Sequence, residues 1–538
     1  PGVAASGGRP FVPLRPEGSP PRSPRGPGAA RRARLRGDLL RWYQLPRYAR
    51  LLAATAASCT ASGVGSGWDA DSYDFWPTAV SVSGPSDERQ WAARRAPMQE
   101  LRSSILSMAA KEASVNKSNR GGWQSATPNL LFMLTGAAGA RARAEVQAAL
   151  EGHLRSLSEP GSPQPLGGRA LVRIVHSWAN VNAWGDWNAP HMHPGSDLSG
   201  ALYVSCPGSK PCSLVLEDGR PRAHAGWESL LREHANASGE QSLQMPEGSI
   251  AVFPGWLKHY VPPVLDSEAK HHAQRITLSF NARVLLQPGP PPLSVRFESP
   301  KTAAASDVAE GARVASQPHE LWPTQVTTAY PSSSGMRGHM ASMQSLRASL
   351  PARATELLGL LGQTEASFPG MIAARRQAEA SIEAHLLRQA AVVGLHSGEA
   401  VVRFASSWAT PHRSLPLRRP HGHPGSDLSG VLCVSCPEGA PYVLELEDPR
   451  AAAAGAVDTP LGALLGSGLP NFLRLWEPGV MVFPSWLDHY AEPKGEDEGV
   501  GRHLWTLISF GAKVDLRPDS RPFRVRFEVA PQASEGEL

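Results

Sequence analysis

The stretch HPGSDLSG occupies residues 193–200 and recurs letter for letter at residues 423–430, an offset of 230. The same offset relates VSCP at 204–207 to 434–437 and VRFE at 295–298 to 525–528. A shared opening, Trp-Pro-Thr, stands at 76–78 and 322–324, where the offset is 246, so the earliest parts of the two copies differ in length. The duplication predicts two homologous domains at 75–300 and 318–538, joined by a linker at 301–317.

Each copy begins with helical sequence and continues with short strand-like runs. In the first copy, helices are expected near 98–115 and 140–157, and strands near 170–184, 199–206, 212–218, 249–255 and 275–284. The strand-like runs are rich in β-branched and aromatic residues and are bounded by Gly, Pro, Asn and Asp, which is typical of short strands between turns. Several such strands predict a mainly β fold with flanking helices, a sandwich or jelly roll in each copy.

The composition of the 538 residues agrees with that fold class. Gly (51) and Pro (50) are abundant and charged residues make up only 19%, which favours β-rich domains with long loops over helical bundles. No run of about 18 apolar residues occurs, so no membrane span is expected.

The positive charge is concentrated at the start of the chain. Residues 1–50 hold 11 Arg and no Lys against Glu17 and Asp38, a balance of +9, whereas the whole chain carries +5. The remainder therefore sums to 5 − 9 = −4, and no nucleic-acid partner is expected, because a nucleic-acid reader carries its basic residues on a folded face. The basic leader at 1–74 resembles an organelle transit peptide, or is a tail without an address, which leaves a cytoplasmic or an organellar location open.

Five cysteines are too few and too unevenly placed to predict a disulfide scaffold. Cys433 and Cys436 form a lone C-x-x-C within a strand-like run, and without a second pair they are better explained by buried packing than by a zinc knuckle.

Histidines repeat in two matching triplets. His191 and His193 flank a single residue and His259 follows much later in the first copy, while His421, His423 and His489 repeat this spacing in the second copy. Residues i and i+2 at the mouth of a strand point to the same side, so a third imidazole from a distant strand could complete one face of a metal. Three protein ligands leave open the coordination positions that a catalytic metal needs.

The sequence around these histidines resembles a known family. SDLSGALYV at 196–204, MPEGSIAVFPGWLKHYVPP at 245–263 and QRITLSFN at 274–281 are similar to segments of the Fe(II)/2-oxoglutarate-dependent oxygenases, as are SNRGGWQS at 118–125 and FWPTAV at 75–80. The resemblance covers nearly all of the first copy and the C-terminal two thirds of the second. It implies two tandem double-stranded β-helix (jelly-roll) domains, with Fe(II), 2-oxoglutarate and dioxygen as the cofactor and co-substrates.

The resemblance also assigns metal ligands in the first copy. His191 would be the first ligand and His259 the distal one, whereas His193 stands where the wider superfamily has an Asp or Glu. We expect His193 to be the third ligand, because neither Asp197 nor Asp218 has the spacing of the missing carboxylate.

The distal carboxylate of 2-oxoglutarate needs a buried cation, for which Arg gives two parallel hydrogen bonds. Arg275, which follows His259 at the start of the next strand-like run, stands where the family places that Arg, and Thr277 lies further along on the same strand face. Asn182, before the His pair, is expected to line the same pocket. A surface ion pair of Arg275 is the alternative interpretation.

The second copy departs from this pattern, because Trp505 and Leu507 replace Arg275 and Thr277. We therefore expect a hydroxylating dioxygenase with catalysis in the first copy, and a second copy that is degenerate or binds only metal at His421, His423 and His489. The alternatives are a non-enzymatic cupin-like binding or scaffold protein, and a three-His iron dioxygenase that uses no keto acid. The two copies could also pack as an intramolecular pseudo-dimer.

Overall fold

The computed structural model describes residues 68–75, 77–85, 87–158, 167–207, 211–220, 239–263, 274–290, 292–298, 315–350, 360–362, 367–412, 420–436, 441–450, 470–491 and 505–528. Residues 1–67 of the expected leader and 301–314 of the expected linker lie outside the described residues. The first half below means the described residues up to 298, and the second half those from 315 onward.

The first half contains both predicted helices and all the predicted strands. Its elements are β1 (Trp68–Phe75), β2 (Thr78–Gly84), α3 (Glu88–Ala109), β3 (Asn119–Arg120), β4 (Trp123–Gln124), α4 (Leu130–Met133), α5 (Gly136–Ser156), β5 (Gly168–Asn182), β6 (Trp187–His191), β7 (Leu198–Ser205), β8 (Cys212–Glu217), β9 (Glu240–Met245), β10 (Ile250–Pro254), β11 (His259–Val261), β12 (Arg275–Pro288) and β13 (Leu293–Phe297).

The second half repeats this order. Its elements are β14 (Ala315–Leu321), β15 (Thr324–Pro331), α7 (Met336–Ser349), the 3₁₀ helix η3 (Leu360–Gly362), α8 (Met371–Val392), β16 (Ser397–His412), β17 (Leu428–Ser435), β18 (Tyr442–Leu446), β19 (Asn471–Leu475), β20 (Val480–Pro484), β21 (His489–Ala491), β22 (Trp505–Pro522) and β23 (Arg524–Phe527). The offset of the repeated octapeptide also places each of the strands β5 and β7–β13 on its counterpart among β16–β23, to within a residue or two at its start.

Each half is a double-stranded β-helix of a large and a small sheet. The first half has the sheet β13-β5-β12-β7-β10-β2-β14, with β4 on β5, and the smaller sheet β3-β6-β11-β8-β9. The second has β1-β15-β20-β17-β22-β16-β23 and β19-β18-β21. The fold is therefore mainly β with flanking helices, and the predicted pair of jelly rolls is confirmed.

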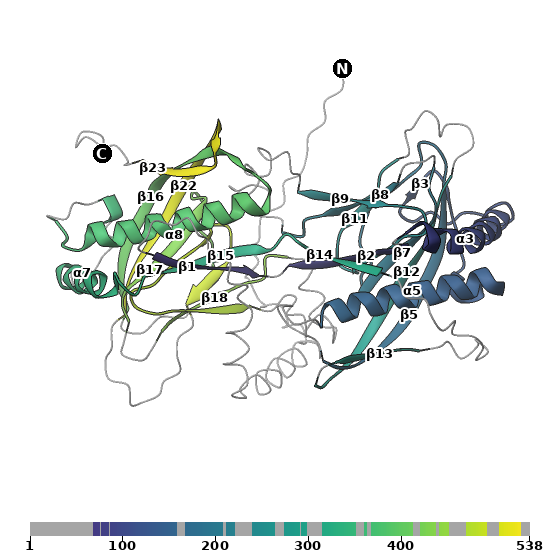
Figure 1. Cartoon of the computed structure of the whole chain (residues 1–538), viewed down its shortest axis with the longest axis horizontal. Coiled ribbons are helices and arrows are strands. Elements are labelled where there is room, and N and C mark those ends of the chain that lie inside the picture. The colour runs from purple at the N-terminus through teal and green to yellow at the C-terminus, as the bar shows by residue number, and fades with distance from the viewer. Residues whose placement is uncertain are drawn as a thin grey trace, which may run out of the picture. The chain divides into compact units, whose positions relative to one another are not determined.

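Two apolar layers hold each half together. One lies between the two sheets, where Tyr203 and Phe253 meet Leu214 and Leu216, and in the second half Val326 and Phe483 meet Leu444 and Leu446. The other lies between the large sheet and the helices, which cover one of its faces (Figure 1). Both layers are made of alternate residues of the large-sheet strands, because successive side chains point to opposite faces.

The glycine of the repeated octapeptide has a packing role. A Cβ at Gly200 would overlap the carbonyl oxygen of Ala251 and the ring of Phe280, and a Cβ at Gly430 would overlap the ring of Phe510. The strands β7 and β17 need glycine at this point because an aromatic ring from the neighbouring strand occupies the space of a side chain.

The large sheets exchange strands between the two copies. β1 pairs with β15 from Trp68↔Pro331 to Phe75↔Thr324, and β14 pairs with β2 from Leu321↔Thr78 to Ala315↔Gly84. In both antiparallel pairs, the numbers of any two partnered residues sum to 399. The segments 68–84 and 315–331 therefore pair with each other in the same register before and after the Trp-Pro dipeptides. This exchange has no signal in the sequence, and it gives each large sheet one strand from the other copy.

Two buried arginines bridge the copies near these dipeptides. Arg220 binds Asp218 at 2.7 Å, and its Nη1 donates to the carbonyl oxygen of Pro323 at 3.0 Å. Arg450 binds Asp448 at 2.8 Å and donates to the carbonyl oxygen of Pro77 at 3.2 Å.

The same guanidinium groups contact indole rings of the opposite copy. The Arg220 guanidinium lies 5.8 Å from the ring centroid of Trp486, and that of Arg450 lies 5.3 Å from the ring centroid of Trp256. Each arginine thus joins its own half to the loop that precedes the distal histidine of the other.

Two further sequence expectations concern cysteines and membranes. The structure pairs Cys206 with Cys212 and Cys433 with Cys436 as disulfides. Cys433 and Cys436 are therefore not the packing thiols that the sequence predicts, although Cys433 is fully buried. Of the helices in the described part of the chain, none is sufficiently long and apolar to cross a membrane.

Candidate metal centre

Three imidazoles meet at one end of the first jelly roll. His191 ends β6 and pairs directly with His259 at the start of β11, while the backbone N–H of His193 donates to the carbonyl oxygen of Gly255 at 2.8 Å. The ring centroids of the three are 4.4 to 5.1 Å apart, and their ligand atoms lie within 4.8 Å of one another. The structure thus brings together the three residues that the His-x-His spacing singles out.

Backbone carbonyls orient two of these rings. Nδ1 of His191 donates to the carbonyl oxygen of Ala189 at 2.7 Å, and Nδ1 of His259 donates to that of Leu257 at 2.8 Å. Since a carbonyl oxygen only accepts, Nδ1 carries the proton and Nε2 keeps its lone pair, which is the tautomer that metal-bound histidines adopt when a carbonyl holds the other nitrogen.

Burial also keeps these rings neutral. It lowers the pKa of His193 to about 3, with help from nearby His191, and holds the pKa of His259 well below its usual range. Burial lowers the pKa of His191 as well, partly offset by the hydrogen bond to Ala189. Three neutral imidazoles suit a divalent transition metal such as Fe(II), so the donor set fits the metal that the resemblance implies.

The alternative carboxylate ligands are not in the cluster. Asp218 pairs with Arg220, and Asp197 Oδ2 accepts the backbone N–H of Val284 at 2.7 Å. Within the described ranges, the group that could hold a metal in this half consists of histidines alone.

The second half contains a matching group. The ring centroids of His421, His423 and His489 are 4.8 to 5.2 Å apart, and Nδ1 of His489 donates to the carbonyl oxygen of Leu487 at 2.9 Å. Burial lowers the pKa of His489 to about 3, reinforced by the other two histidines. Both halves therefore place a trio of imidazoles at the same point of the fold.

Arg275 is buried beside the first cluster and is not a surface ion pair. It is 2% exposed, and its Nη1 and Nη2 donate to the carbonyl oxygens of Pro262 and Asp186 at 2.7 and 3.3 Å. These carbonyls lie on the segments that follow His259 and precede His191. Nε of Arg275 is buried without a hydrogen-bond partner, so this cation has capacity for one more acceptor.

Arg275, Thr277 and Asn182 lie on adjacent strands. Arg275 of β12 pairs with Asn182 of β5, and Thr277 is further along β12 and accepts a 3.4 Å hydrogen bond from Asn180. All of these side chains are buried, and Nδ2 of Asn182 has no partner. The predicted co-substrate residues are therefore neighbours in one buried polar cluster.

Tyr203 belongs to the same buried polar cluster and was not predicted from the sequence. It pairs with Thr277 across β7 and β12, is fully buried, and its hydroxyl has no hydrogen-bond partner. Burial raises the pKa of Tyr203, against the opposing effect of the nearby Arg275. A signal was available, because LSGALYVSCP and LSGVLCVSCP differ at only two positions, one of which is Tyr203.

The equivalent positions of the second half hold no charged side chain. Cys433, Trp505 and Leu507 take the places of Tyr203, Arg275 and Thr277 in the strand registers, and all three belong to one hydrophobic cluster. Leu507 is 2% exposed. The described side chains at these three positions therefore offer no cation for a carboxylate.

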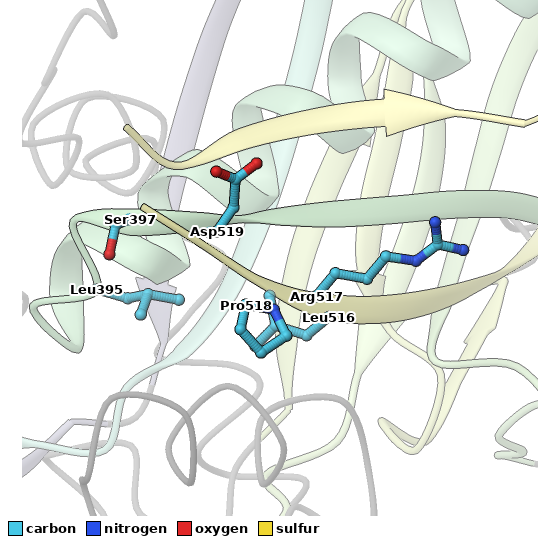
Figure 2. Close-up of a pocket in the computed structure, with 7 residues that line it drawn as sticks. Leu395, Ser397, Leu516, Arg517, Pro518 and Asp519 are labelled. Atoms are coloured by element: carbon cyan, nitrogen blue, oxygen red, sulfur yellow. The ribbon is translucent and has the colours of Figure 1, made fainter. Parts of the chain in front are cut away.

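The second half contains a hollow at one end of β16 and β22. Figure 2 shows it lined by Leu395, Ser397, Leu516, Arg517, Pro518 and Asp519. Ser397 pairs with Pro522 at one end of β16 and β22, whereas His412 pairs with Trp505 at the other end. The hollow is thus at the end of these strands opposite Trp505.

Comparison with known proteins agrees with the family resemblance. Residues 176–281, which include the first histidine cluster and Arg275, match the family model described as "Putative 2OG-Fe(II) oxygenase". A search of the curated proteins finds no match.

Solved structures that match part of the chain include a Pseudomonas putida prolyl-4-hydroxylase (14% identity, 35% of this chain and 86% of that chain, TM-score 0.22). They also include a 2OG-Fe(II) oxygenase family oxidoreductase from Burkholderia pseudomallei (12%, 38% and 84%, TM-score 0.21). A third is HygX from Streptomyces hygroscopicus with nickel, 2-oxoglutarate and hygromycin B bound (11%, 38% and 82%, TM-score 0.24). Over residues 176–281 the chain matches the 2OG-Fe(II) oxygenases, oxidoreductases whose cofactors are Fe(II) and 2-oxoglutarate.

Proposed function

We propose that the first half is an Fe(II)/2-oxoglutarate-dependent dioxygenase that hydroxylates its substrate, and that catalysis takes place in this half. One observation carries the proposal. The buried Arg275, with an unpaired Nε, lies between the segments that bear His191 and His259. A buried cation with unused hydrogen-bonding capacity is expected where a protein receives an anion.

The iron would be held by three histidines. His191 and His259 would bind it through Nε2, because Nδ1 of each ring donates to a carbonyl oxygen, and His193 would bind it through one of its ring nitrogens. When bound, Fe(II) supplies the redox chemistry in which dioxygen oxidises the substrate while 2-oxoglutarate is converted to succinate and carbon dioxide. Three neutral ligands leave the full double charge of the ion, which favours binding of the anionic keto acid.

Arg275 would bind the distal carboxylate of 2-oxoglutarate. The pocket presents three buried hydrogen-bond donors without partners, Nε of Arg275, the hydroxyl of Tyr203 and Nδ2 of Asn182. A dianion that fills the pocket would satisfy these donors and neutralise the guanidinium, whose pKa burial lowers in its absence. The hydroxyl of Thr277 adds a fourth potential donor.

We also propose that the two copies pack as an intramolecular pseudo-dimer. The shared register of 68–84 with 315–331 and the reciprocal contacts of Arg220 and Arg450 support this proposal. Such an arrangement contacts the same surface on both copies, as in an isologous dimer interface.

The test is an Arg275→Met variant, compared with Arg283→Met as the matched control. Arg283 lies on the same strand, is exposed, and donates to the carbonyl oxygen of Gly195. We expect Arg275→Met to keep the iron content of the wild type and to lose both the visible band of the iron-bound keto acid and the conversion of 2-oxoglutarate to succinate. Arg283→Met should keep all three.

Unchanged keto-acid binding in Arg275→Met would contradict the assignment of the pocket. Iron uptake without any keto-acid band in the wild type would favour the three-His iron enzyme that uses no keto acid. Absence of iron uptake would favour the non-enzymatic binding protein.

A further inference from the structure

The second histidine cluster retains its imidazoles, although Cys433, Trp505 and Leu507 replace Tyr203, Arg275 and Thr277 on the neighbouring strands. We propose that His421, His423 and His489 form a second metal site, which holds a divalent first-row transition ion and takes no keto acid. The ion would have a structural role, separate from catalysis in the first half.

The spacing of the ring nitrogens suits one shared ion. Nε2 of His423 lies 3.2 Å from Nε2 of His489. Two nitrogens bound at about 2.1 Å to one ion, at angles of about 90 to 110°, are separated by about 3.0 to 3.4 Å. Because Nδ1 of His489 donates to Leu487, its Nε2 presents a lone pair toward His423, as a metal ligand must.

The backbone holds the three residues in place. His421 and His489 exchange two backbone hydrogen bonds of 3.2 and 3.1 Å, and the backbone N–H of His423 donates to the carbonyl oxygen of Ser485 at 2.8 Å. Rings of Phe483 and Trp408 pack against His489 and His423 at centroid distances of 4.6 and 5.7 Å. The backbone frame already holds the three ligand atoms within 4.8 Å of one another, which lowers the cost of binding one ion.

The described side chains on the neighbouring strands offer no cation for a keto acid. The carboxylate of 2-oxoglutarate would meet Cys433, bonded to Cys436, and the side chains of Trp505 and Leu507. Burial of a carboxylate without a cation is strongly unfavourable. The site therefore combines a complete set of metal ligands with the absence of a co-substrate pocket among its described residues.

An ion at this site would hold in place a loop that contacts the first half. Trp486 and Leu487 lie between Ser485, which holds His423, and His489. The Arg220 guanidinium of the first half contacts the Trp486 ring. Tying His423 and His489 to one ion would restrict this loop, so metal binding should stabilise the contact between the copies.

The experiment measures metal per chain and keto acid per chain separately. Metal-free wild-type protein is loaded anaerobically with Fe(II) alone, passed through a desalting column and analysed for iron, and then titrated with 2-oxoglutarate. The same measurements are made on His259→Ala and His489→Ala, and on two control variants with exposed histidines replaced, His176→Ala and His396→Ala. Thermal unfolding with and without metal is recorded for each protein.

We expect two iron ions per chain in the wild type and in both controls, and one in each cluster variant. His489→Ala should keep the keto-acid band, whereas His259→Ala should lose it but still show a rise in melting temperature with metal. If His489→Ala does not fold, the wild type alone decides the matter, because the proposal requires two ions and one keto acid per chain.

One iron per chain in the wild type, unchanged in His489→Ala, would overturn the proposal; the close approach of His423 to His489 would then be a hydrogen bond between two imidazoles. Two keto acids per chain would overturn the exclusion of the co-substrate. Two ions with no keto acid would contradict the proposed function of the first half and leave the second metal site standing.

Discussion

Replacement of Tyr203 by Phe should change stability and co-substrate affinity in opposite directions. The hydroxyl is fully buried and has no partner in the protein without ligands. A buried unpaired polar group costs about 1–3 kcal/mol, so its removal should stabilise the metal-free protein by about that amount. The ring itself is retained, so the packing between β7 and the small sheet should not change.

The same hydroxyl should bind the keto acid. A hydrogen bond to a charged group contributes about 1.5–3 kcal/mol, which corresponds to a loss of about 10- to 150-fold in 2-oxoglutarate affinity. Chemical unfolding of the metal-free protein measures the first effect, and anaerobic titration of the iron-loaded protein with 2-oxoglutarate measures the second.

Tyr260→Phe is the matched control. The Tyr260 hydroxyl donates to Glu240 at 2.8 Å near the surface, so its loss should leave keto-acid affinity unchanged and stability nearly so. A Tyr203→Phe protein that is less stable than the wild type, with unaltered affinity, would refute the reasoning, since the hydroxyl would then be bound within the protein and not offered to the co-substrate.

Three other perturbations test the fold. Arg220→Met leaves the 1% exposed side chain of Asp218 without its cation, and chemical unfolding should show a loss of about 3–5 kcal/mol; a loss below about 1 kcal/mol would mean that the pair is solvated. Gly200→Ala forces a Cβ into the ring of Phe280 and should lower the melting temperature, and an unchanged melting temperature would contradict the close packing of β7 on β12. Burial lowers the pKa of His153 to about 4 in the folded protein, against 6.5 unfolded, so the unfolded state binds more protons between these values. The contribution of His153 to the free energy of unfolding is thus fully present above the unfolded pKa, and it falls by about 3 kcal/mol as the pH drops to the folded pKa. This dependence of stability on pH should be absent in His153→Gln.

Much of the fold can be predicted from the sequence because the duplication repeats the same pattern of strands in both copies. Runs such as RITLSFNARV have strand-forming residues between turn formers, and β12 follows the expected range closely. The His-x-His spacing and the distant His259 also predict the cluster, because strand geometry places residues i and i+2 on one side and a jelly roll brings distant strands to one mouth.

The strand exchange was not predictable in this way. β1 and β14 have homologous positions, so each could pair with the strand beside it in either copy, and local propensity does not distinguish the two partners. Only the tertiary structure shows that residues 68–75 pair with 324–331. Tyr203 was overlooked for a related reason: an aromatic residue in a strand is normally interpreted as packing, and its unpaired hydroxyl becomes evident only beside Arg275.

The most direct test of the central claim is a count of 2-oxoglutarate molecules bound per chain when iron is saturating and oxygen is absent. Keto-acid binding by one half alone, through Arg275 and Tyr203, predicts one equivalent per chain in the wild type and none in Arg275→Met at the same iron content. Two equivalents would show that the pocket of Trp505 and Leu507 accepts the co-substrate, and one equivalent retained in Arg275→Met would show that the first half binds it elsewhere; either result would contradict the account.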